Sequence, residues 1–324
     1  MRSTGPSVSE KRIDALPKIK REGEETAMSE FLSANLPYLL SGISVGGQYA
    51  LIAIGYTMVY GILRLINFAH GDVFMVAGLI MVYLSAAPSL PIYVSIVLVV
   101  VVTVAIGVII EKVAYKPLRS APRMSVMISA IGVSYLLQNC ALYFTGGLPQ
   151  IYPTIPFLSE QVQIGSATTK MVTIITPILT IVLVLLLVLM IKRTKTGMAM
   201  RAVSRDFETS ELMGIKINNV ISMTFVIGCF LAAIGSLLYF TNYNSVIPTS
   251  GAMPGLKAFV AAVFGGIGSV PGAVIGAFII GICENIIKGP GLTEFSDAFT
   301  FVLLIVILLV KPTGIFGEKS TDKV

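Results

Sequence analysis

The chain has no tryptophan and a single histidine among 324 residues, and charged residues make up only 12 % of it. Soluble domains average about 25 % charged residues. Hydrophobic residues reach 55 %, more than a soluble core of this size can bury, so the composition indicates a protein that crosses a membrane several times. The net charge of +6 comes from loops between apolar runs and therefore gives no indication of nucleic-acid binding.

Several catalytic and nucleotide-binding motifs are missing. The sequence has no GxxxxGK[ST] and no GxGxxG between a strand and a helix, so the chain is not expected to hydrolyse ATP itself. One histidine excludes histidine-based metal sites, and the three cysteines lack the spacing of metal ligands. The acidic residues in the apolar part are scattered. We therefore expect a non-catalytic chain with no bound metal or cofactor.

Residues 1–29 differ from the rest of the chain, because they mix charges of both signs and have no apolar stretch. They fail as a signal peptide, and the sequence predicts a disordered polar tail. Residues 30–317 form the expected membrane domain, and 318–324 a short C-terminal tail.

Apolar runs long enough to span a bilayer predict an all-α integral membrane protein with about eight spans, ten being possible. They lie near 36–60, 68–87, 91–111, 124–144, 171–191, 219–241, 255–287 and 297–311. Four glycines and a proline interrupt the run 255–287 between Phe264 and Gly272. Since helix interiors resist both residue types, we expect two shorter helices or a re-entrant break there.

Basic loops orient the chain. Loops 112–123 and 192–216 carry most of the Lys and Arg residues between spans, so they are predicted to be cytoplasmic, and 146–170 and 242–254 external. With a cytoplasmic C-terminus, this parity leaves the basic N-terminal tail outside unless the run 36–60 breaks near its glycines. A weak echo between the glycine-bearing regions 42–78 and 251–281 suggests paired helix interruptions of the kind that mark transport pathways.

The loop 192–216 is unusually long and charged. Thr194 or Thr196 can cap a helix start and Gly214 can end the helix. Met200, Val203, Phe207, Ser210 and Gly214 recur at spacings of three and four, which predicts one soft face opposite charged residues. Two interpretations remain open from the residues alone: a helix solvated on the membrane surface, or one that fits a cleft in a cytoplasmic partner.

Six segments resemble the permease subunits of branched-chain amino acid ABC transporters, the Liv-type family. They are 47–61, 66–72, 196–202 with 212–215, 255–259, 265–273 and 311–317. The resemblance implies half of a dimeric pore in a bacterial or archaeal plasma membrane. Its partners would be a homologous but non-identical second permease, two cytoplasmic ATPases that use ATP and Mg, and an external binding protein. Leucine, isoleucine and valine are the expected cargo, with urea, short amides and other amino acids as alternatives.

The resemblance also implies that 196–215 couples the chain to the ATPases. The positions carried over are Gly197, Arg201, Ala202, Asp206, Leu212 and Gly214. Gly197 would permit a close approach, Arg201 and Asp206 would be charge partners across the interface, and Leu212 an apolar knob.

Two further groups of residues can each be interpreted as structural or as functional. Asn67, His70 and Asp72 either cap a helix at the membrane interface, with His70 wet and Asp72 near the positive helix end, or take part in gating. The break residues Gly265, Gly266, Gly268, Pro271 and Gly272 either allow close helix packing or free backbone groups to line a pathway.

The sequence disfavours two other classes of membrane protein. An ion-coupled secondary transporter would need titratable groups at mid-membrane, and the runs 91–110 and 172–190 offer almost none. A structural scaffold is disfavoured by the glycine-broken spans. Glu284, late in an apolar run, is expected to meet water or a neighbour.

Overall fold

The structure is a computed structural model that describes residues 8–87, 90–119, 121–165, 167–289 and 291–317, with side chains from Asn35 onward except Arg123. Its elements are α1 (Val8–Leu63), α2 (His70–Ser85), α3 (Ile92–Ile110), η1 (Glu111–Tyr115), η2 (Lys116–Leu118), α4 (Arg123–Thr145), β1 (Gln150–Ile151), α5 (Pro156–Ser159), β2 (Gln161–Ile164), β3 (Ala167–Lys170), α6 (Met171–Arg193), α7 (Lys195–Arg205), α8 (Phe207–Leu212), α9 (Ile217–Tyr243), β4 (Ser245–Val246), α10 (Ala252–Gly265), α11 (Val270–Lys288) and α12 (Thr293–Val310).

Within the described residues, seven helices are long and apolar enough to cross a membrane, and α2 and α10 are shorter apolar helices. This confirms the all-α membrane architecture. The predicted division of 255–287 is also confirmed, because α10 and α11 are separate helices joined by a turn at 266–269.

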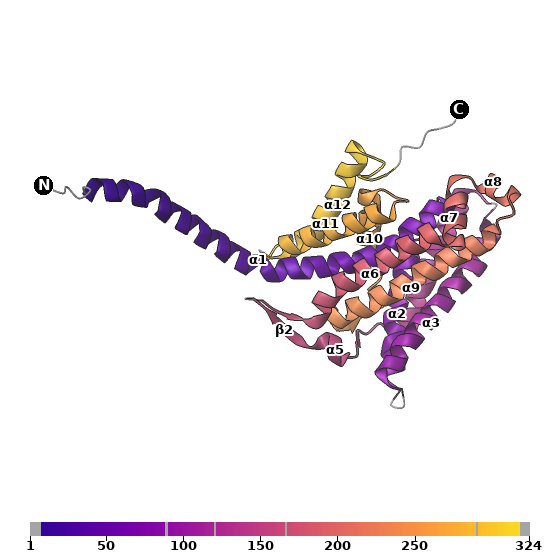
Figure 1. Ribbon diagram of the computed structural model, residues 1–324. Helices are drawn as coiled ribbons and strands as arrows, with labels where there is room; N and C mark the ends of the chain where they lie inside the picture. The colour runs from indigo at the N-terminus through magenta and orange to yellow at the C-terminus, as the bar shows by residue number, and fades with distance from the viewer. Residues whose placement is uncertain (1–7, 88–89, 120, 166, 290, 318–324) are drawn as a thin grey trace.

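Helix α1 runs through the centre of the bundle and packs against α6, α9, α10 and α11 (Figure 1). The break near its glycines, which would have brought the N-terminal tail to the cytoplasmic side, does not occur, because α1 is continuous. A Cβ added at Gly42 would lie 2.8 Å from Cα of Ile282, and one at Gly46 2.8 Å from Cα of Phe278. These glycines let two helix backbones approach closely, which is the usual role of small residues between membrane helices.

The expected disordered tail is not what the backbone shows from Val8 onward, since α1 begins there. Residues 8–34 are rich in Glu, Lys, Arg and Ala, which favour helix. They also extend a helix that is already formed, so no new helix nucleus is required. Residues 1–7 and the predicted C-terminal tail 318–324 lie outside the described residues.

Helices α2 and α10 both begin inside the bundle. A Cβ added at Gly251, just before α10, would lie 2.1 Å from the carbonyl oxygen of Gly71 in the first turn of α2. The imidazole of His70 lies against Gly55, eight residues from the C-terminal end of α1, and against Gly228, near the middle of α9. The two half-length helices therefore meet at their N-terminal ends, deep in the membrane domain, and they account for the sequence echo between 42–78 and 251–281.

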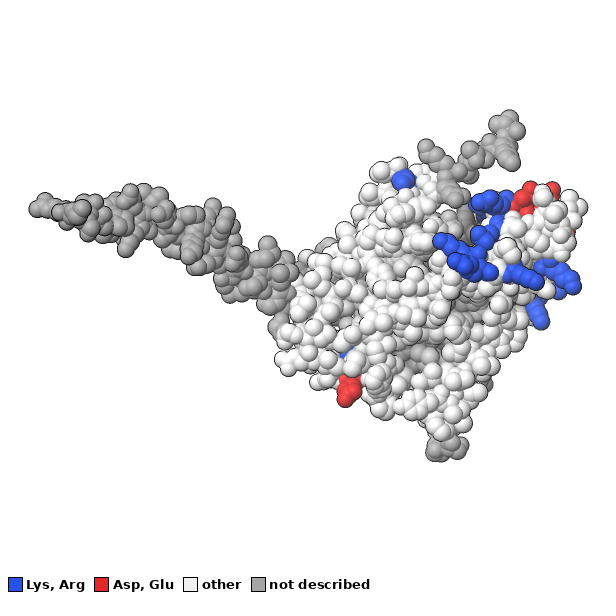
Figure 2. Space-filling model, viewed as in Figure 1, with Lys and Arg blue, Asp and Glu red and all other residues white. Residues whose placement is uncertain are grey.

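The two ends of the bundle differ in charge. One end carries α7, α8, η1, η2 and the C-terminal end of α1, and the lysines and arginines gather there, whereas the long sides of the bundle are almost uncharged (Figure 2). The other end carries α5 and two small antiparallel ribbons, β1–β4 and β2–β3. The predicted basic loops thus lie together, and the positive-inside rule makes their end the cytoplasmic one.

Candidate functional site: the coupling helices and the half-helix junction

The charged loop 192–216 forms two helices rather than the single one expected. The Thr194 hydroxyl caps α7 by accepting a hydrogen bond from the Gly197 amide at 3.1 Å. Asp206 separates the helices, because its backbone leaves the helical region (φ −149°) and its carboxylate accepts from the Thr209 amide at 3.0 Å. A short acidic side chain that satisfies the first turn of α8 competes with continuation of α7.

The weakly polar face predicted for the loop 192–216 largely turns toward the membrane domain. Met200, Val203 and Ser210 are buried, while Phe207 is exposed. Leu212, at the end of α8, is 88 % exposed, and Met213 beside it is nearly as open. An apolar side chain left this exposed at the aqueous end of a membrane protein is typical of a docking surface.

Each carried-over position of the coupling loop has a clear placement. Gly197 is buried, and a Cβ there would lie 2.3 Å from the carbonyl oxygen of Ile191, so its close approach is to α6 of its own chain. Arg201 is exposed on α7, Ala202 is half-buried, and Gly214 ends α8 with φ +83°. Asp206 serves as a helix cap, a role the sequence interpretation missed although Asp is among the residues most favoured at the start of a helix.

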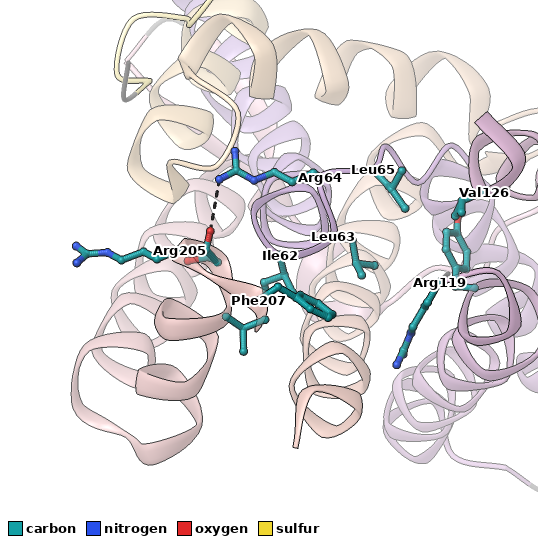
Figure 3. Close-up of a pocket in the computed structure, with 11 residues that line it drawn as sticks. Ile62, Leu63, Arg64, Leu65, Arg119, Val126, Arg205 and Phe207 are labelled. Carbon is teal, nitrogen blue, oxygen red and sulfur yellow. Dashed lines mark hydrogen bonds between the residues drawn. The ribbon is translucent and has the colours of Figure 1, made fainter. Parts of the chain in front are cut away.

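A cavity of about 340 Å³ lies between the coupling helices, the end of α1, the start of α4 and the residues on either side of η2, Tyr115 and Arg119 (Figure 3). The guanidinium of Arg64 donates to the carbonyl oxygen of Ser204 across this space at 3.4 Å, whereas Arg205 points away from it. Arg119 is held by Glu111 and by Asn218. The coupling helices are therefore tied to the end of α1 but are not packed solidly against it.

Asn67, His70 and Asp72 are all buried, so the structure contradicts the wet interfacial position. Asn67 accepts a hydrogen bond from the Tyr115 hydroxyl at 2.6 Å. Asp72, in the first turn of α2 as expected, accepts from Ser134 at 2.5 Å and from Gln138 at 2.9 Å. The three side chains face different neighbours and form no common cluster, because the chain between them re-enters the bundle instead of running along its surface.

His70 packs edge-on against the ring of Tyr56 at 5.2 Å between centroids. The same tyrosine hydroxyl lies at the N-terminal ends of both half-length helices, since it contacts the Gly71 amide and would lie 3.2 Å from a Cβ at Gly255. Tyr56 was not singled out from the sequence, and no local pattern distinguishes it from the other tyrosines of the apolar runs.

The glycine-rich turn between α10 and α11 supports the packing interpretation. A Cβ at Gly265 would lie 1.9 Å from the Gly272 carbonyl oxygen, while Gly266 and Gly268 have φ of +108° and +100°. Pro271 stands in the first turn of α11. The carbonyl groups of Phe264 and Gly265 accept from Ile315 and Phe316 at 3.0 Å, so the C-terminal segment occupies the backbone groups that the break releases.

A buried charge network joins α1, α10, α11 and α12. The Lys257 ammonium contacts Glu284 at 2.7 Å and Asp297 at 2.6 Å. Glu284 also pairs with Lys288 and accepts from the Tyr49 hydroxyl at 3.0 Å. The expectation that Glu284 meets a neighbour is confirmed, and Lys257, a charge inside the same apolar run, was the available signal that the sequence interpretation passed over.

Comparisons with known proteins follow this geometry. The family described as "Branched-chain amino acid transport system / permease component" matches residues 38–308. This chain belongs to that family. It is 39 % identical to BraD of Pseudomonas aeruginosa, a "High-affinity branched-chain amino acid transport system permease protein", over 89 % of this chain and 98 % of that one.

Identity to LivH of Escherichia coli K12, which has the same description, is 40 % over 92 % of this chain and all of LivH. A ribose import permease of Haemophilus influenzae, RbsC, is 26 % identical over 81 % of this chain and 79 % of its own length. The permease therefore is a multi-pass membrane component of a transport system, and the resemblance drawn from the six segments is confirmed.

Proposed function

We propose that this permease imports leucine, isoleucine and valine as half of the membrane pore of an ATP-driven importer in a bacterial or archaeal plasma membrane. An external binding protein delivers the amino acid, and two cytoplasmic ATPases that bind ATP and Mg supply the energy. The second half of the pore is a homologous, non-identical permease. The observation that carries the proposal is a capped pair of helices, with exposed Leu212 and Arg201, at the basic end of a chain without a phosphate-binding motif.

The relatives support the cargo. Those at about 40 % identity, BraD and LivH, are both described as high-affinity branched-chain amino acid permeases, while the ribose permease stands at 26 %. Urea, short amides and other amino acids remain alternative cargoes, because in such a system the binding protein makes much of the selection.

The coupling interface follows from the exposed residues. Leu212 offers an apolar knob and Arg201 a charge, while Asp206 fixes the angle between α7 and α8. The Arg64–Ser204 hydrogen bond then passes displacement of α7 to the end of α1. Closure of the ATPases on ATP would in this way reach the helix that contacts the half-helix junction.

Uptake of radiolabelled leucine tests the proposal in proteoliposomes that contain the permease with the partner permease, ATPases and binding protein encoded beside it. Uptake is expected to require ATP and the binding protein and to fall with Arg201→Glu, with Lys192→Glu as a charge-matched control outside the carried-over positions. Uptake that persists without ATP, or that follows a proton or sodium gradient, would support the ion-coupled class instead. Neighbouring genes that encode no ATPase and no binding protein would also contradict it.

A further inference from the structure

Four spans lie at the periphery of the bundle with few buried residues: α3, α4, α6 and α12. Away from their ends, three of them turn their hydroxyl side chains inward. The buried ones are Ser95 and Thr103 of α3, Thr173, Thr176 and Thr180 of α6, and Ser296 and Thr300 of α12. Their exposed large side chains are apolar, such as Val97, Leu185 and Ile305. This is the pattern expected of helices that face lipid.

Helix α4 differs, because polar side chains lie on its outward face among exposed apolar ones such as Ile128 and Leu136. Its outward face exposes Tyr135 (62 % exposed), Asn139 and Cys140, which are ten, six and five residues from its outer end at Thr145. Its inward face is polar as well, because Ser134 and Gln138 both donate to Asp72 of α2. On the outward face the Asn139 carboxamide already donates to the Tyr135 carbonyl oxygen at 2.8 Å. The polar groups that would pay a desolvation cost in hydrocarbon are therefore the Tyr135 hydroxyl and the Asn139 carboxamide oxygen.

The inward face of α4 lies next to the half-helix junction, and the outward face is separated from the junction by the width of the helix. Asp72, which holds α4 from behind, follows Gly71, and Gly71 contacts Gly251 where α2 and α10 begin. In the part of the chain that the structure describes, α4 therefore carries polar side chains both toward the junction and on its outward face. The exposed groups are a phenol hydroxyl, a carboxamide and a thiol, which are uncharged hydrogen-bonding groups that suit a zwitterion in transit without holding it as an ion pair would.

We propose that the outward face of α4, through Tyr135, Asn139 and Cys140, lines the water-filled path along which the amino acid crosses the membrane. The inference rests on the proposed transport function and deepens it, since it names the residues beside the cargo. Lipid contact at this face, or dry packing against the second permease, are the outcomes that would overturn it.

Thiol labelling tests the inference, because a charged methanethiosulfonate reacts with thiolate and therefore with cysteines that contact water. Cys140 is native and exposed, whereas Cys229 is buried and Cys283 partly so. Variants of the intact importer in proteoliposomes keep Cys140 in a Cys229→Ala, Cys283→Ala background. A second set carries Cys140→Ala with either Tyr135→Cys or Ile181→Cys.

Ile181 is the matched control, because it is 50 % exposed on α6 and also ten residues from the outer end of its helix. Tyr135→Cys and native Cys140 are expected to react at least about tenfold faster than Ile181→Cys. Leucine with the binding protein, or trapping the ATPases with ATP and vanadate, is expected to change their rates but not that of Ile181→Cys.

The inference would be overturned if the cysteines at positions 135 and 140 were labelled as slowly as Ile181→Cys in every state. It would also be overturned if these cysteines could be cross-linked to the second permease but not labelled. Leucine uptake by the unlabelled importer is measured in the same vesicles. If leucine is taken up but the cysteines are not labelled, only the proposed path along α4 is refuted. If no vesicles take up leucine, the result counts against the proposed function.

Discussion

Removal of the Lys257 ammonium is the perturbation with the best-defined consequence. In Lys257→Met, a side chain of similar length and apolar character replaces a charge that is buried between Glu284 and Asp297. The Glu284 side chain is only 2 % exposed. It then has to keep its charge while buried, without the more buried of its two lysine partners.

The cost can be estimated from what remains around Glu284. Breaking a buried ion pair costs about 3–5 kcal/mol when the remaining charge is left uncompensated. The Tyr49 hydroxyl and Lys288 stay in place, but Lys288 is 28 % exposed and so compensates only partly. We therefore expect Lys257→Met to lower the free energy of unfolding by about 2 kcal/mol, which shifts the folded-to-unfolded ratio roughly 30-fold.

Unfolding of the purified permease in mixed detergent micelles measures this change. The control is Lys288→Met, which leaves Glu284 its more buried partner, Lys257, and should cost less than about 1 kcal/mol. The double variant Lys257→Met/Glu284→Gln should be more stable than Lys257→Met alone, because it removes the stranded charge. Additive losses in the double variant, or a larger loss in Lys288→Met than in Lys257→Met, would refute the reasoning.

Three further substitutions test the junction and the coupling helices. Gly251→Ala should destabilise the permease by about 1–3 kcal/mol, because the added methyl group clashes with Gly71; thermal unfolding measures the change. The control is Gly132→Ala on α4, where the added methyl group meets nothing within 4 Å, and it should be neutral or slightly stabilising. Asp206→Ala should remove the cap of α8 at about 1 kcal/mol and reduce ATP-driven uptake, and Asp206→Asn should retain most of both; equal uptake by the two variants would contradict the capping role. Gly197→Ala should separate α7 from the end of α6 and lower uptake while the amount of permease in the membrane stays unchanged, and unaltered uptake would argue against the close approach at Ile191.

The features that could be predicted from the sequence are those that depend on the properties of neighbouring residues in the chain. Long apolar runs predicted the spans, and the glycines and proline between Phe264 and Gly272 predicted the break between α10 and α11, because both depend on the residues themselves. The glycines of α1 gave the wrong break, since a glycine in a membrane helix can serve a close neighbour as well as a kink. Only the position of α11 against Gly42 and Gly46 separates these two roles.

The candidate sites depended still more on tertiary contacts. The coupling loop could be placed from its caps and charges, although Asp206 was given a role across an interface and proves to divide two helices. Asn67, His70 and Asp72 are close in sequence but face neighbours in η1, α9 and α4, respectively. They do so from a re-entrant segment that no periodicity reveals. Lys257 and Asp297 are 40 residues apart in the printed sequence, and their pairing through α10 and α12 is a property of the packed bundle.

Helix α1 connects the two candidate sites mechanically. At its cytoplasmic end Arg64, one residue beyond the helix, donates to Ser204 in α7. About two turns back along the helix, Tyr56 contacts Gly71 and Gly255, and Gly55 contacts His70. An α-helix is stiff along its axis because each turn is bonded to the next, so a push on α7 that reaches α1 reaches the junction of α2 and α10. The junction has no slack, since glycine backbones already touch there at Gly71 and Gly251. Movement of α1 is therefore expected to be met by relative movement of α2 and α10, and α4 packs against α2.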